Sequence, residues 1–283
     1  MAGKKLDMGA AWSSAMSLIA QNKDTVGAIV GLFFFLPYLA VALLVPEAAN
    51  PQPAEVAPGA SPDAAAKAAM EQLTAAYSEN WPVLLGVTVA QFVGSLSLLA
   101  LLGNPDSPTV GQSLKRGLGA APSYFVAQIL SALFVAVVVG VPLGLVMAAA
   151  PGVAVAVAVL VAMVAAIYLF VKFSLLAPVI AIEGFRNPIT ALSRSWQLTK
   201  GNSVRIAIFM ALLILTVGII SLLVTLVLGL VFALFSPAVA QIGNAVAAGL
   251  VNTALGVIFV LVLAAVHQQL AGPSGDQLAA TFE

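Results

Sequence analysis

The feature that most constrains this chain is a set of six apolar runs, each long enough to cross a bilayer core as a helix of ~20 residues. Backbone N–H and C=O groups find no water inside a bilayer, so each run is predicted to be α-helical. With 61% apolar and only 8% charged residues, the chain has too little charge to cover its apolar surface in water. We therefore expect an all-α integral membrane protein forming one membrane domain, residues 1–283. The runs are residues 26–45, 83–102, 124–149, 153–173, 204–235 and 246–266.

The positions of the basic residues predict the orientation of the chain. Of its 11 Lys and Arg residues, only Lys67 follows the first run and precedes the second. The others lie before the first run, between the second and third, or at and after the end of the fourth, which six spans place on one side. Because cytoplasmic segments carry the excess of Lys and Arg, both termini and the tail 271–283 are predicted to be cytoplasmic.

The same topology makes residues 46–81 the one long external loop. Its first part is rich in Pro and Ala, which is typical of an extended linker. Residues 63–80 contain good helix formers, with Ser61 or Asp63 as the N-cap. We expect a solvated loop, and a docking surface for an external partner is the alternative.

Three segments on the predicted cytoplasmic side resemble one another: residues 6–22, 108–123 and 188–202. Each has apolar residues at helical spacing, which indicates an amphipathic helix, and each leads after a short polar break into a span. An internal repeat of amphipathic helix plus two spans therefore accounts for the chain. Successive units enter the membrane in the same direction, so an axis along the membrane normal would relate them. The repeats are predicted at 6–103, 107–182 and 186–270.

Helices of this kind suit the membrane interface. They either anchor the chain and fix the angles of the spans, or form a collar that contacts anionic lipid head groups or a partner. Lys172, at the end of the fourth run, is expected to reach the head groups, and the alternative is a pairing with Glu183. The candidate head-group contacts are Lys115, Arg116, Lys172, Arg186 and Arg205.

Prolines and glycines punctuate the spans. Pro37 and Pro142 predict kinks, and Pro178 predicts a break at the end of the fourth span. Gly27 and Gly31 have the GxxxG spacing that favours close helix packing.

The residues that carry chemistry are sparse. There is no Cys, His267 is the one histidine, and no Asp or Glu lies at the centre of a run. His267 is expected to be a polar cap of the last span. We predict no catalytic residue, no metal site and no cofactor. A net charge of zero gives no indication of a nucleic-acid partner.

Residues 175–206 read LLAPVIAIEGFRNPITALSRSWQLTKGNSVRI. This stretch resembles the signature of a bacterial family named for the membrane domain of glycerophosphoryl diester phosphodiesterase. At the end of the last span, His267 and Gln268 stand where the family has Tyr and Arg. The residues that carry the resemblance are Pro178, Glu183, Gly184, Ala191, Leu192, Arg194, Ser195, Trp196, Leu198, Thr199, Lys200, Gly201 and Asn202.

The resemblance implies a location in a bacterial inner membrane, but not the enzymatic activity in the family's name. This chain has no room for the soluble catalytic barrel that some members carry, and its one histidine does not supply that enzyme's metal site. The residues that carry the resemblance, which include Glu183 and those from Arg194 to Asn202, are therefore expected to shape the third cytoplasmic helix. The function we expect is non-enzymatic scaffolding, regulation or membrane organisation, through contacts with lipids, a membrane-protein partner or a second copy. The alternative is a transporter or lipid-handling protein with a cleft between the repeats.

Overall fold

The structure is a computed structural model that describes residues 5–45, 61–103, 109–150 and 152–272. It is 90% helical, with no strand in the described part. Six of the described helical stretches are long and apolar enough to cross a membrane, which confirms the six spans and supports a multi-pass membrane protein. Residues 46–60 of the expected external loop, the linker 104–108 and the tail 273–283 lie outside the described residues. The spans are Lys23–Leu44, Ala64–Leu102, Val110–Ala149, Gly152–Ala181, Ser203–Phe232 and Val239–Ala271.

The chain falls into two compact units, and each is described by itself. Unit 1 comprises Met1–Val26, Ser95–Thr216 and Ile258–Glu283, and unit 2 comprises Gly27–Gly94 and Val217–Val257. The helices are α1 (Met8–Gln21), α2 (Lys23–Val30), η1 (Gly31–Phe35), α3 (Leu36–Leu44), α5 (Pro62–Leu102), α6 (Val110–Val135), η2 (Ala136–Gly140), α7 (Val141–Ala149), α8 (Gly152–Phe173), α9 (Leu176–Ala181), α10 (Pro188–Thr199), α11 (Ser203–Phe232) and α12 (Pro237–Ala271).

In unit 2, the rings of the first span pack against glycines of other helices. A Cβ on Gly94 of α5 would lie 2.9 Å from the Phe34 ring, and one on Gly249 of α12 would lie 3.2 Å from the Phe35 ring. An added Cβ on Gly94 would overlap the first-span rings, and one on Gly249 would force the Phe35 ring to move by a few tenths of an ångström. By contrast, no described atom would lie within 4 Å of a Cβ on Gly27 or Gly31, so the close packing expected of that GxxxG pair is not made within the described chain.

The helix predicted at residues 63–80 is confirmed. It begins at Pro62 and is continuous with the second span as α5. Ser61 caps it, since its Oγ accepts a hydrogen bond from Ala64 N at 3.3 Å. The helix changes direction at Asn80, whose φ of −111° and ψ of 15° are not helical. Pro82, two residues later, removes one helical N–H, which explains why the helix is interrupted there.

Two spans widen into a π-helical turn next to a proline. The turn η1 is followed by Pro37, and η2 is followed by Pro142. A proline cannot donate a hydrogen bond to the carbonyl four residues earlier, and a wider turn redistributes the bonds around that gap. The two expected kinks thus take the form of wide turns.

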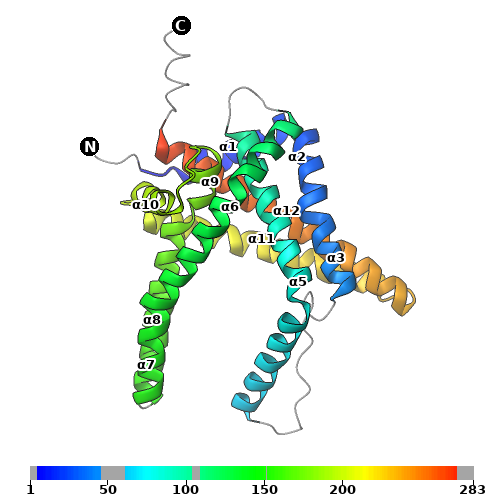
Figure 1. Cartoon of the computed structure of the whole chain (residues 1–283). Coiled ribbons are helices and arrows are strands. Elements are labelled where there is room, and N and C mark those ends of the chain that lie inside the picture. The colour runs from blue at the N-terminus through cyan, green and yellow to red at the C-terminus, as the bar shows by residue number, and fades with distance from the viewer. Residues whose placement is uncertain (1–4, 46–60, 104–108, 151, 273–283) are drawn as a thin grey trace. The chain divides into compact units, whose positions relative to one another are not determined.

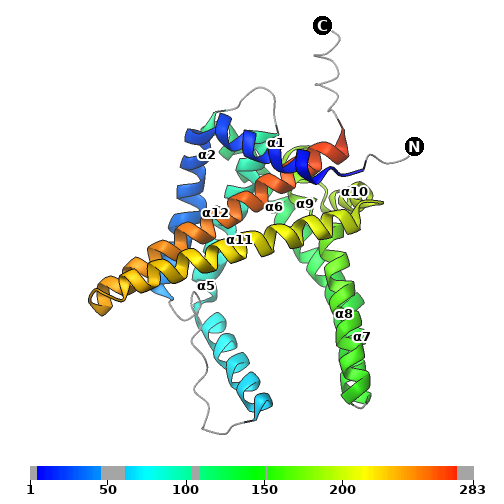
Figure 2. The same ribbon diagram turned by 180° about the vertical axis from the view of Figure 1, so that it is seen from behind.

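In unit 1, α7 and α8 lie side by side, and α9 and α10 lie at the other end of α8 from α7 (Figures 1 and 2). The break expected at Pro178 is present. It falls at residues 174–175, between α8 and α9, because Pro178 has no N–H to bond the Ser174 carbonyl. All residues 175–180 are buried, so this apolar stretch is covered by protein, unlike the exposed face of α8.

The three expected cytoplasmic helices differ in how they meet the spans. The segments at 6–22 and 188–202 form separate helices, α1 and α10, each followed by a break before the next helix. The segment at 108–123 does not: α6 begins at Val110 and continues through Pro122 into the span without the expected polar break. Their amphipathic character and the threefold repeat stay predictions.

Candidate functional site

The polar side chains of unit 1 gather where α9 and α10 lie, and we call this the polar end of unit 1. It is formed by residues 5–7, 109–123, 168–205 and 265–272. Local sequence starts several of its helices. Asn187 Oδ1 accepts a hydrogen bond from Ile189 N at 2.9 Å at the start of α10, and Thr109 and Gln112 form a reciprocal capping box at the start of α6.

The centre of the polar end is the carboxylate of Glu183, which lies between the guanidinium group of Arg194 and the imidazole ring of His267. Its Oε2 accepts a hydrogen bond from Arg194 Nε at 2.8 Å, and its Oε1 lies 2.7 Å from His267 Nε2. Burial raises the pKa of Glu183, but the hydrogen bonds from His267 and Arg194 lower it by more, so the pKa lies below its ordinary value of 4.5. The carboxylate is therefore ionised and only accepts hydrogen bonds, which makes His267 Nε2 a donor.

His267 is buried, with 2% of its surface exposed. Its Nδ1 has no hydrogen-bond partner among the described residues. The expectation that this histidine caps the last span is therefore met at one nitrogen only. His267 and Glu183 are far apart in the sequence, and no local pattern indicated their contact.

Lys172 does not pair with Glu183, the alternative considered from the sequence. Its ammonium instead lies over two rings, 5.3 Å from the centre of Tyr168 and 5.2 Å from the centre of Trp196. Ser195 Oγ donates a hydrogen bond of 2.8 Å to the Lys172 backbone carbonyl, which fixes α10 against the end of α8. Tyr168 was missed by the sequence analysis, although it precedes Lys172 by one helical turn on the same face.

The end of the motif binds the beginning of the chain. Asn202 Oδ1 accepts a hydrogen bond from Leu6 N at 2.9 Å, and Arg205 Nη1 donates to the Leu6 carbonyl at 3.1 Å. Gln269 of α12 exchanges two hydrogen bonds of 3.1 Å with the backbone of Asp7. Gly201, at φ 81°, makes the turn that brings Asn202 into place. None of these long-range contacts was visible in the sequence.

The other motif and head-group candidates divide into inward and outward positions. Arg186 donates to the Gly119 carbonyl, and its own carbonyl accepts from Ser123 Oγ at 2.6 Å. Lys200 ends α10 as its C-cap and is exposed. Of the five predicted head-group contacts, Lys172 is buried, with 3% of its surface exposed. The exposed ones are Lys115, Arg116, Arg186 and Arg205.

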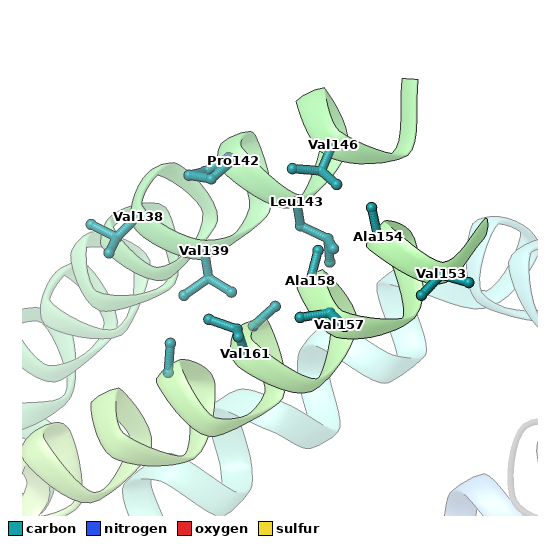
Figure 3. Close-up of a pocket in the computed structure, with 12 residues that line it drawn as sticks. Val138, Val139, Pro142, Leu143, Val146, Val153, Ala154, Val157, Ala158 and Val161 are labelled. Atoms are coloured by element: carbon teal, nitrogen blue, oxygen red, sulfur yellow. The ribbon is translucent and has the colours of Figure 1, made fainter. Parts of the chain in front are cut away.

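The described residues of unit 1 form hollows, two of which bear on function. A groove of about 760 Å³ between α8 and the stretch η2–α7 has a wholly apolar lining, which includes Val139, Leu143 and Val157 (Figure 3). A second hollow of about 650 Å³ has a mixed lining from α6, α8, α9 and α12. Tyr124 and Gln128 contribute its polar atoms and bond one another at 2.8 Å.

No group of three or more His, Cys, Asp or Glu that could hold a metal occurs among the described residues. No protein family, curated protein or solved structure matches the chain. The resemblance of residues 175–206 to a phosphodiesterase membrane domain therefore stays a prediction, and what the polar end does must be argued from its own geometry.

Proposed function

We propose that this chain is a non-enzymatic, multi-pass protein of a bacterial inner membrane, which organises the membrane or scaffolds a partner by contacting anionic lipids at the polar end of unit 1. Its six apolar helices support the membrane location. In this proposal both termini are cytoplasmic, and the head groups that meet the polar end belong to the cytoplasmic leaflet. A partner protein or a second copy would assemble on the surface so anchored.

The observation that carries the proposal is the imbalance of charge in unit 1. Its described residues include nine Lys and Arg against three Asp and Glu. One of the three acids, Glu183, is 17% exposed at its side chain and is already paired with Arg194. Anionic head groups attract exposed basic side chains by about 1 kcal/mol each. The described charged side chains of unit 2 are Lys67, Glu71 and Glu79, an excess of acid that suits the opposite side of the membrane in this proposal.

Native mass spectrometry of the gently extracted protein tests this function. We expect bound anionic phospholipid to survive extraction and to be lost progressively as ionic strength rises, because salt screens exposed charges. Retention of zwitterionic lipid to the same degree would contradict the charge argument. A monomer that retains neither lipid nor partner would contradict both the proposed lipid contact and the proposed scaffolding role.

Lipid handling or transport is a second candidate, and the hollows of unit 1 favour it. The mixed-lined hollow joins residues of the predicted second repeat, such as Phe170, to Phe259 and Leu263 of the third. The apolar groove has the lining that an acyl chain requires. Reconstitution with a fluorescent phospholipid distinguishes the two candidates: accelerated movement between leaflets supports handling, and no acceleration supports organisation. Hydrolysis of a glycerophosphodiester by the purified chain would contradict both.

A further inference from the structure

Lys172 is a buried cation for which the described protein supplies no anion. No described Asp or Glu lies within 4.0 Å of its ammonium, and no described acceptor takes a hydrogen bond from it. The rings of Tyr168 and Trp196 face it, and such contacts offset part of the cost of taking a charge out of water. They leave the three N–H donors of the ammonium unused.

Lys172 lies one residue before the end of α8, next to an exposed apolar face of that helix. Ile167, Tyr168 and Phe170 are about half exposed on that face, whereas Leu169 and Val171 are buried. Tyrosine and tryptophan side chains favour the depth of the lipid head groups, where Tyr168 and Trp196 would place Lys172. The anions at that depth are lipid phosphates.

The surroundings of Lys172 favour one anion with an attached apolar chain. Lys200 is exposed, and its charge acts on Lys172, so both lysines raise the local positive potential. The Phe173 ring lies 5.9 Å from the Trp196 ring and also lines the mixed hollow of about 650 Å³. A head group beside Trp196 and an acyl chain along Phe173 would thus lie next to each other.

We propose that Lys172, framed by Tyr168 and Trp196 and assisted by Lys200, binds the phosphate of one anionic phospholipid whose acyl chain enters the hollow beside Phe173. This inference rests on the proposed lipid-contacting function and assigns it a defined site. The phosphate reaches the ammonium by displacing the ring of Tyr168, a residue that is 47% exposed. This displacement leaves the core of unit 1 intact.

Fluorescence of Trp196 alone tests the site. The chain has three tryptophans, and Trp12 and Trp81 are 40% and 61% exposed, so Trp12→Phe and Trp81→Phe are compatible with folding. The single-tryptophan protein is reconstituted in phosphatidylcholine, and quenching is titrated with phosphatidylglycerol or phosphatidylcholine brominated in the acyl chain. We expect phosphatidylglycerol to quench Trp196 at about tenfold lower mole fraction, the ratio typical of one charged hydrogen-bonded contact.

Four variants locate the preference of Trp196 quenching for phosphatidylglycerol. Lys172→Met removes it, Lys172→Arg keeps it, and Lys67→Met, at an exposed basic position of unit 2 outside the proposed lipid-binding residues, keeps it as the matched control. Lys200→Met reduces it in part and, being at an exposed position, keeps the test open if Lys172→Met does not fold.

The outcomes separate the site from the general function. Equal preference in the wild type and in Lys172→Met, with anionic lipid still retained in native mass spectra, would overturn the site and leave the proposed function standing. A wild-type protein that retains no lipid in native mass spectra would contradict the proposed lipid-contacting function itself. Inorganic phosphate that reverses the quenching, when the same ionic strength of chloride does not, would assign the site to free phosphate and overturn the lipid.

Discussion

Glu183 is the residue on which the polar end of unit 1 depends most. It joins the turn after α9 to α10 through Arg194 and to α12 through His267. The polar side chains of the motif thus connect backbone segments that lie far apart in the sequence. Ser195 and Asn202 act in the same way, on the carbonyl of Lys172 and the N–H of Leu6.

Replacing Glu183 by Gln is expected to destabilise the protein by about 2 kcal/mol, since it weakens two charge-assisted hydrogen bonds and leaves Arg194 without its carboxylate. Thermal unfolding in detergent measures the change. The control is Glu71→Gln, which removes an exposed carboxylate 3.9 Å from Lys67 and should cost about 0.5 kcal/mol or less. Equal losses in the two variants would show that the Glu183 contacts contribute no special stability.

The lowered pKa of Glu183 also predicts a pH dependence. The unfolded chain binds this proton near pH 4.5, whereas the folded chain binds it only at lower pH. The contribution of Glu183 to stability is therefore complete above pH 4.5 and is lost as the pH falls through the lower folded value. Melting temperatures measured on acidification should fall by more in the wild type than in Glu183→Gln. Parallel curves would contradict the assigned direction.

At the scale of elements, packing depends on glycines that face other helices. A Cβ on Gly117 of α6 would lie 2.8 Å from the backbone N of Ser97 in α5, an approach that backbone atoms cannot relieve without a shift of the helix. Gly111, also on α6, has no described atom within 4 Å of the same position. The two glycines therefore differ in role although the sequence does not distinguish them.

Gly117→Ala is expected to cost about 1–3 kcal/mol through overpacking of α5 against α6. Gly111→Ala should be neutral or slightly stabilising, because alanine favours helix where space allows. Unfolding of both variants under the same conditions measures the difference. A Gly117→Ala protein as stable as the wild type would show that α5 and α6 do not approach as closely as described.

Sequence alone predicted the elements better than their contacts. The six spans, the helix capped by Ser61 and the break before Pro178 followed from apolar length, capping and proline chemistry, which act over a few residues. The continuity of α6 through Pro122 was not predicted, because a polar stretch that contains a proline indicates a boundary between helices. The pairing of Glu183 with His267 depends on how α9 and α12 pack, which no local pattern encodes.

At the scale of the whole molecule, charge is divided along the sequence. Unit 1 holds nine of the ten described basic residues, and unit 2 holds Lys67 among its acids. The proposed lipid contact requires that Lys172 and the exposed basic residues of unit 1 meet one leaflet, and the predicted topology puts Lys67 on the other side of the membrane.

Cysteine accessibility tests this requirement most directly, since the chain has no native Cys. Lys23→Cys, Lys67→Cys and Lys115→Cys place single thiols at exposed positions. A membrane-impermeant maleimide is added to cells whose outer membrane is permeabilised and whose inner membrane is intact. It should label Lys67→Cys at once. It should label Lys23→Cys and Lys115→Cys only after the inner membrane is opened. Labelling of Lys67→Cys and Lys115→Cys from the same side would contradict the account.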